Sequence, residues 1–153
     1  MSHFFQFEAD FVESLRCIPM QVRYKLDACG VKLKLQHWHQ FMQGERQSLV
    51  DLPCGTEGEA ASYREHLQQM VVEHMGQAAS ALPVEACPAW MDETVIPLSV
   101  QEKATETGVG LTLEQWRSLS PLQRFVLIKL SRSGHENSNF LPAMQEFQLV
   151  SAD

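Results

Sequence analysis

The sequence is short of the features that mark most enzymes and membrane proteins. Its 153 residues contain no Gly-x-Ser-x-Gly, no phosphate-binding glycine loop, no His-Glu-x-x-His and no dinucleotide-binding fingerprint. The longest apolar runs, such as 125–128, fall far short of the roughly 20 residues of a membrane-spanning helix. The first ten residues lack a basic region, and Glu8 and Asp10 interrupt any apolar stretch. We therefore expect a cytoplasmic protein without a secretory signal.

Basic residues are also scarce. Twelve Lys and Arg stand against 19 Asp and Glu, and the formal net charge is −7. This balance argues against nonspecific binding of DNA, RNA or anionic lipid. Residues 112–131 look like a helix–turn–helix, but the second helix has too few polar and basic side chains to read a DNA groove. The 44% of hydrophobic residues predicts one compact domain with its own core.

The cysteines lack the spacing of a familiar site, because no two of them form a Cys-x-x-Cys pair. They are Cys17, Cys29, Cys54 and Cys87. In a reducing compartment this pattern predicts free, partly buried thiols rather than disulfides or a zinc site. The histidines predict no metal site either. His37 and His39 would diverge by about 200° on a helix, and His66 and His74 would stand about 12 Å apart.

What the sequence does contain is an internal repeat. Residues 18–52 align without a gap with residues 96–130, and 12 of the 35 pairs are identical, where chance gives about two. The pattern predicts two copies of one helical unit, about 18–75 and 96–150, within an all-α single domain of seven to eight helices spanning 1–153. We expect a pseudo-twofold axis to relate the two units, because neither unit is expected to cover its apolar face alone.

Helix boundaries follow from local signals in each copy. An Ile-Pro pair opens the first helix and Gly30 or Gly108 closes it, while capping boxes begin later helices. In copy order, the expected helices are 19–29 and 97–107, 35–41 and 113–119, 44–52 and 121–132, and a fourth pair beginning at Ser62 and at 138. The fourth helix should carry an apolar stripe that consists of Tyr63, Leu67, Met70, Val71 and His74. The linker 80–95 is expected to be an extended surface strap, and the alternation at 33–35 is too short to predict a sheet.

Positions shared by the two copies predict scaffold roles. The paired tryptophans, leucines and valines are expected in the core, and the paired glycines in turns. The pairs Arg46/Arg124 and Lys25/Lys103 are expected to cap helix ends or to pair with carboxylates.

Charge, in contrast, differs between the copies. Residues 16–34 hold five basic residues against one acidic residue, whereas the equivalent 94–112 have a net charge of −1 and 51–94 a net charge of −7. A basic patch of this kind can receive an acidic protein surface or a phosphorylated ligand, and the plain alternative is a solvated helix face. The candidate partner-binding residues are Arg16, Cys17, Arg23, Lys25, Asp27, Cys29 and Lys32.

Residues 5–30 resemble the opening of the nitrate reductase-associated protein family. The likeness continues through Leu-x-Leu-x-x-Trp at 33–38 and the Leu-Pro-Cys turn at 52–54. Members resemble one another as small soluble proteins, mostly cyanobacterial, whose genes lie near those for nitrate reductase and molybdenum-cofactor synthesis. The resemblance implies a nonenzymatic accessory factor for maturation or assembly of assimilatory nitrate reductase. Its partner would be the reductase or a molybdenum-cofactor delivery protein, with no cofactor, nucleic acid or membrane involved.

Two alternatives stay open. The first is a thiol-dependent enzyme or redox sensor that uses Cys17, because Arg16 and a predicted helix start could lower the pKa of its thiol. The equivalent residue of the second copy is the apolar Val95, which favours a small buried residue instead. The second alternative is a binder of a molybdopterin-type cofactor, which the lack of a glycine-rich loop makes weaker.

Overall fold

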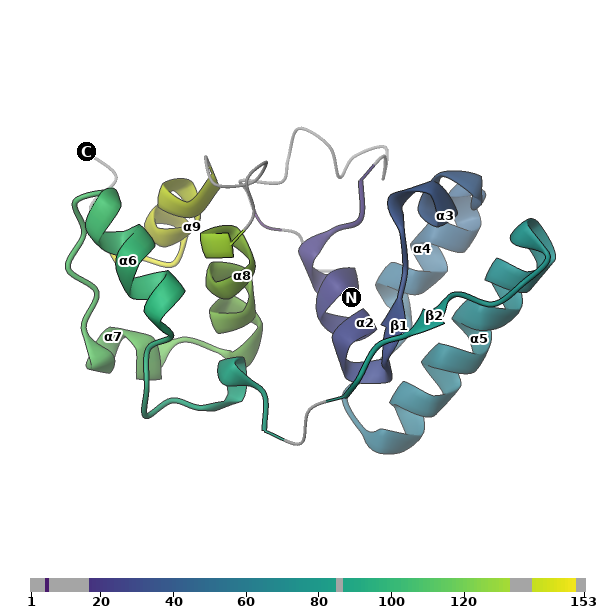
Figure 1. The fold of residues 1–153 in the computed structure, drawn as a ribbon, viewed down its shortest axis with the longest axis horizontal. Helices are drawn as coiled ribbons and strands as arrows, with labels where there is room; N and C mark the ends of the chain where they lie inside the picture. The colour runs from purple at the N-terminus through teal and green to yellow at the C-terminus, as the bar shows by residue number, and fades with distance from the viewer. Residues whose placement is uncertain (1–4, 6–16, 85–86, 133–138, 151–153) are drawn as a thin grey trace. The chain divides into compact units, whose positions relative to one another are not determined.

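The computed structural model describes residue 5 and residues 17–84, 87–132 and 139–150. Within these residues the chain is mostly helical, with eight α-helices, one 3₁₀ turn and two short strands (Figure 1). The chain forms two compact units, one built around residues 17–84 and the other around 87–150 together with Phe5. The described residues contain the expected number of helices, whereas the pseudo-twofold axis stays a prediction.

The first unit contains four helices and both strands. In chain order these are α2 (Met20–Cys29), β1 (Val31–Lys32), α3 (Leu35–Gln40), α4 (Gln43–Asp51), α5 (Glu57–Met75) and β2 (Ser80–Ala81). Helix α2 packs against α4 and α5, and α3 and α4 also contact α5. Side chains from all four helices are completely buried, among them Val22, Trp38, Leu49, Leu67 and Val71. The long helix α5 is therefore the element on which this unit assembles.

The prediction of an all-α fold is wrong at one place, where a small antiparallel sheet forms. Val31 pairs with Ala81 and Lys32 with Ser80, and the Leu82 N–H donates to the Gly30 carbonyl at 2.8 Å. The sequence around Val31 is too short to indicate a strand by itself. The hydrogen-bonding partner comes from about 50 residues further along the chain, which a local pattern does not reveal.

The expected start of the fourth helix at Ser62 is also wrong, because α5 begins at Glu57. Thr56 accepts a hydrogen bond from the Glu59 N–H at 3.1 Å, and Glu59 accepts one from the Thr56 N–H at 3.1 Å. This reciprocal capping box satisfies two backbone donors at the helix start. Ser62 instead lies inside the helix, in its second turn.

The second unit is arranged around one apolar helix. Its elements are the 3₁₀ turn η2 (Ala89–Met91), α6 (Leu98–Glu106), α7 (Leu113–Ser118), α8 (Pro121–Arg132) and α9 (Phe140–Glu146). Helix α8 contacts η2, α6 and α9. Its residues from Arg124 through Ile128 are all buried, as is Leu130. Both capping boxes expected in this unit are present, at Thr112 with Gln115 and at Ser120 with Gln123.

Residues 89–92 depart from the expected extended strap and are held on the second unit. The Trp90 ring packs edge-on against Phe125 at 5.0 Å between centroids. The Trp90 carbonyl accepts a hydrogen bond from Arg124 Nε at 2.7 Å, and the Asp92 carbonyl accepts one from Trp116 Nε1 at 3.1 Å. Both donors, Arg124 and Trp116, lie outside the linker. The linker sequence alone therefore does not predict these bonds.

The shared positions take scaffold roles with one exception. The side chains of Trp38, Trp116, Val22, Val100, Leu49 and Leu127 are fully buried. Gly30 and Gly108 both adopt the left-handed conformation, with φ of 76° and 81°. Leu35 and Leu113 were expected in the core but are 46% and 42% exposed, and each is the first residue of a short helix. The order of helices agrees with the predicted repeat, and the duplication itself stays a prediction.

Candidate functional site

The residues proposed from the sequence lie at the start of the first unit, on α2 and β1. Arg16 falls outside the described residues. Cys17 is half-buried and precedes Pro19, the residue that caps α2. Arg23 is half-buried, and its Nε donates to the Ile18 carbonyl at 3.2 Å. Asp27 is half-buried on the same helix.

Lys25 points into the unit. Its ammonium group donates to the carbonyls of Val50 and Leu52 at 2.6 and 2.7 Å, at the end of α4. It also lies over the ring of Tyr63, 5.7 Å from the centroid. Burial lowers the pKa of Lys25, and the charges of Cys54 and Asp51 counteract part of that effect. The expectation that this lysine caps a helix end is confirmed.

Lys32 is exposed at the end of β1, and Lys34 follows it in extended backbone. Burial alternates along this stretch, with Val31 buried, Lys32 exposed, Leu33 half-buried and Lys34 exposed. Alternate residues of an extended segment point to the same side. The two lysines, which we call the β1 basic edge, therefore present adjacent positive charges to solvent.

Cys29 lies near Cys54, although the sequence indicated no neighbouring group for either thiol. The Cys29 Sγ lies 3.7 Å from the Leu26 carbonyl oxygen, and the Cys54 Sγ lies 3.6 Å from the Lys25 carbonyl oxygen. These two carbonyls are consecutive on α2, so the sulfurs lie at neighbouring sites. Each thiol also affects the pKa of the other. No spacing rule indicated this pair, because 25 residues and two further helices separate its members.

The two thiols differ in environment. Cys29 is buried, whereas Cys54 is half-buried in the loop between α4 and α5. The hydrogen bond to Cys54 and burial raise the pKa of Cys29. The hydrogen bond from Cys29 and the nearby Lys25 charge lower the pKa of Cys54, although burial and Glu59 oppose this. Cys54 is thus the thiol that is more readily deprotonated.

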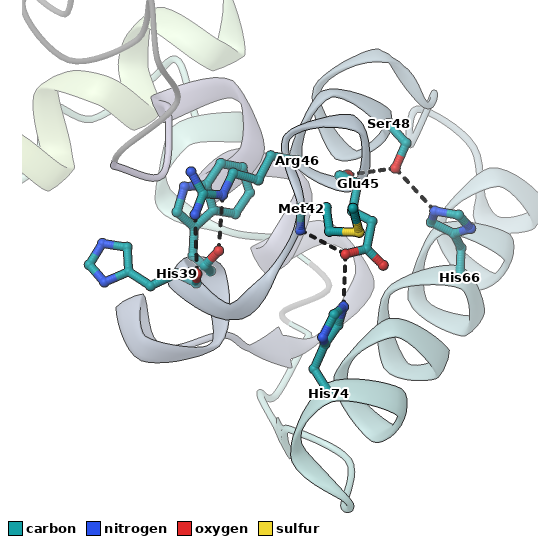
Figure 2. A network of polar contacts seen from close by, with 8 residues as sticks. His39, Met42, Glu45, Arg46, Ser48, His66 and His74 are labelled. Carbon is teal, nitrogen blue, oxygen red and sulfur yellow. Dashed lines mark hydrogen bonds and ion pairs between the residues drawn. The ribbon is translucent and has the colours of Figure 1, made fainter.

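A second polar cluster links α4 with α5 (Figure 2). His74 Nε2 lies 2.8 Å from Glu45 Oε1, and the same oxygen accepts the Met42 N–H at 2.8 Å. Burial raises the pKa of Glu45, but these two bonds and the neighbouring imidazoles outweigh it, and the net pKa is lowered. The predicted apolar stripe on α5 is confirmed except at His74, which is exposed and faces this carboxylate.

His66 and Ser48 form the other half of this cluster. The Ser48 hydroxyl lies 3.2 Å from His66 Nε2 and donates to the Glu45 carbonyl at 2.6 Å. Activation of a serine by a histidine requires the hydroxyl proton to point at the imidazole. Here a carbonyl holds that proton, so the pair ties α4 to α5. Beside it lies a groove of about 500 Å³ that is lined by Met42, Gly44, Glu45, Ser48, His66, Gln69, Met70 and Glu73.

Within the described part of the chain, no three His, Cys, Asp or Glu side chains gather as metal ligands, and no helix has the length and apolar character to cross a bilayer. A protein-family model described as conserved nitrate reductase-associated protein matches residues 4–147, nearly the whole chain. The resemblance found in residues 5–30 is thereby confirmed. No curated protein and no solved structure shows a significant match.

Proposed function

The chain belongs to the nitrate reductase-associated protein family, and we propose that it is an accessory factor for the maturation or assembly of nitrate reductase. The observation that carries this proposal is the family match, which spans residues from both units. The family's description names an association with the reductase, and association through protein contacts is the simplest activity it implies. We further propose that the protein acts in the cytoplasm and without catalysis.

The β1 basic edge is the surface that we assign to this contact. Of the lysines in residues 16–34, Lys25 is directed into the unit by two carbonyl bonds, whereas the candidate Lys32 and the nearby Lys34 are exposed. Val84, which lies against Gly30 beside β1, is 60% exposed and adds apolar surface. On a protein of net charge −7, a local positive edge steers an acidic partner surface into one orientation. The partner would be the reductase polypeptide before it is complete, or a protein that delivers its molybdenum cofactor.

The test is a charge reversal with a matched control. Lys32→Glu with Lys34→Glu changes the edge, and Arg117→Glu with Arg132→Glu makes the same change of charge at exposed sites of the second unit. Each double variant is expressed in nitrate-grown cells from which the gene for the natural protein has been deleted. The readouts are the reductase that co-purifies with the tagged protein and the reductase activity per reductase polypeptide.

We expect the Lys32/Lys34 variant to lose about tenfold or more of the co-purified reductase, as for close complementary charges, and the control to retain it. Reductase activity should fall with it. Equal retention in both variants, with both folded, would overturn the assignment of the surface. Full reductase activity in cells that lack the protein altogether would overturn the accessory role.

A further inference from the structure

The Cys29 and Cys54 thiols are placed as a pair by the packing of α2 against the loop that follows α4. Their sulfurs lie at the consecutive carbonyls of Leu26 and Lys25, at 3.7 and 3.6 Å. Lys25 holds the loop in place, because its side chain donates to Val50 and Leu52, just before Cys54. The packing of the folded unit therefore holds the two thiols near each other.

Access to the two sulfurs is unequal. Cys29 is only 4% exposed, whereas Cys54 is half-buried. A hollow of about 430 Å³ lies beside the Cys54 loop, and its lining includes Leu52, Pro53 and Glu59. Glu59 also accepts the Gly55 N–H at 3.0 Å, which places this hollow next to the residue that follows Cys54. Cys54 is the more exposed residue of the pair, so we expect a small molecule in solution to reach it first.

The charged and titratable groups around the pair come from three helices. Lys25 is on α2, Asp51 is the last residue of α4, and Glu59 and Tyr63 are on α5. Lys25 is the cation among them, and it lowers the pKa of the Cys54 thiol together with the Cys29 hydrogen bond. A thiolate next to a cation, with a less accessible thiol beside it, is the arrangement of a reactive cysteine with a resolving partner.

We propose that Cys54 and Cys29 form a redox-active dithiol site that exchanges with small-molecule disulfides of the glutathione class. The Cys54 thiolate attacks one sulfur of the disulfide, so that a Cys54–glutathione bond forms and one glutathione thiolate leaves. Cys29 then loses its proton to that thiolate and attacks Cys54 Sγ, which releases the second glutathione as a thiolate that takes a proton from solvent. The two protein thiols are oxidised to one disulfide, and one external disulfide is reduced to two thiols.

The product would connect the end of α2 to the loop between α4 and α5. Cys29 is the last residue of α2 and Gly30 next to it begins the turn into β1, so the disulfide closes a loop over residues 29–54. Closing a loop of this length restricts the unfolded chain and stabilises the unit. The β1 basic edge begins only three residues beyond Cys29. Oxidation of the two thiols could therefore alter the contact surface assigned under the proposed function, on which this step rests.

The experiment uses the full chain with Cys17→Ser and Cys87→Ser, which leaves only the pair. The reduced protein is equilibrated in buffers with stepped ratios of oxidised to reduced glutathione, quenched with an alkylating reagent, and examined by intact mass and peptide mapping. We expect one intramolecular disulfide between residues 29 and 54, formed in a single transition. Reduced thiols at every ratio, or disulfides only between chains, would overturn the proposal.

Two added substitutions test the roles of the two thiols. With Cys29→Ser, we expect one glutathione per chain to accumulate on Cys54, because nothing resolves the mixed disulfide. With Cys54→Ser, we expect Cys29 to stay reduced. Glutathione that accumulates on Cys29 in preference to Cys54 would overturn the assigned order. Circular dichroism of each variant identifies any that fail to fold, and the variant that retains both thiols then remains the deciding measurement.

A third test concerns Lys25. Site-resolved alkylation of the natural chain against pH should place the midpoint for Cys54 below the value of about 8.5 for an ordinary thiol. Lys25→Met should slow alkylation of Cys54 severalfold at pH 7, whereas Lys25→Arg should retain most of the rate. Lys103→Met, the equivalent change in the second unit, is the matched control and should have no effect. A Cys54 midpoint at or above 8.5 would overturn the proposed nucleophile.

Discussion

Arg46 in the first unit and Arg124 in the second stand at equivalent positions, and each donates to the carbonyl of the tryptophan in the preceding short helix. Arg46 reaches the carbonyls of Trp38 and His39 and is half-buried. Arg124 is only 4% exposed and reaches the carbonyls of Trp116, Leu119 and Trp90. One of these acceptors, the Trp90 carbonyl, lies in the 3₁₀ turn, a segment that packs on the second unit.

The lysines at equivalent positions differ even more. Lys25 donates to two carbonyls at the end of α4, whereas Lys103 lies 3.9 Å from the exposed carboxylate of Glu106 on its own helix. The residue equivalent to Cys29 is Thr107, which bonds the carbonyl of Ala104. The comparison shows that residues at aligned positions keep their place on a helix, while the neighbouring chain decides which groups they contact.

The arginines offer the largest expected difference between the units. Arg124→Met should destabilise the protein by about 4 kcal/mol, because it leaves buried carbonyls without their charged donor. Arg46→Met should cost about 1.5 kcal/mol, since the Arg46 side chain is half-buried and water can solvate one of its acceptors, the carbonyl of the exposed His39. Urea unfolding followed by circular dichroism measures both. Equal losses of unfolding free energy in the two variants would show that burial of the guanidinium does not distinguish the two units.

Gly30 and Gly108, which follow α2 and α6, test the same comparison at the backbone. Both have positive φ, but a Cβ on Gly30 would meet Val84 Cγ2 at 2.8 Å and the Leu82 carbonyl at 2.9 Å, whereas nothing lies within 4 Å of one on Gly108. Gly108→Ala should cost about 1 kcal/mol for the left-handed conformation alone. Gly30→Ala should cost about 3 kcal/mol, because steric overlap adds to that strain. Thermal melts of the two variants, compared with the natural chain, check the order, and a smaller loss at Gly30 would contradict it.

The smallest expected effect concerns Glu45 and its equivalent Gln123. Both cap a helix start, Glu45 at the Met42 N–H and Gln123 at the Ser120 N–H, but only Glu45 also bonds a histidine. Glu45→Gln should destabilise by about 0.5 kcal/mol, as for a partly exposed ion pair. Because the folded pKa of Glu45 is lowered, its contribution is present above the unfolded pKa and is lost as pH falls through the folded pKa.

Unfolding of the natural chain and the Glu45→Gln variant at pH 6 and at about pH 3 checks this sign. We expect the difference in stability at pH 6 to shrink at the lower pH, as the Glu45 carboxylate takes up a proton. Gln123→Glu serves as the reciprocal control. A difference that grows on acidification would contradict the assigned role of the carboxylate.

Local signals predicted most helices in this chain. The prolines before α2 and α6, the glycines after α2 and in the turn after α6, and the capping boxes of α7 and α8 act within three or four residues, so their meaning does not depend on the rest of the fold. Ser62 shows the limit of this reasoning, because a capping box also occurs six residues earlier, at Thr56, and the helix begins there.

Of the candidate site, the sequence predicted the excess of positive charge near β1 but not which cations reach solvent. Lys25 and Lys32 are alike as residues, and only the position of the α4 carbonyls turns one of them inward. Cys17 was the one thiol for which the sequence left a reactive role open, although its apolar counterpart Val95 favoured a small buried residue. The structure instead places Cys54 next to a cation and a second thiol, which requires the packing of α2 against a loop 25 residues away.

By itself, the sequence determined the helical character, the family and most helix ends of this protein. The tertiary structure decided the strand pair, the burial of Arg124, the inward direction of Lys25 and the meeting of Cys29 with Cys54. The reason is the range of the forces involved. Caps and turns satisfy backbone groups of neighbouring residues, whereas solvation and side-chain pairing depend on segments that only core packing brings together.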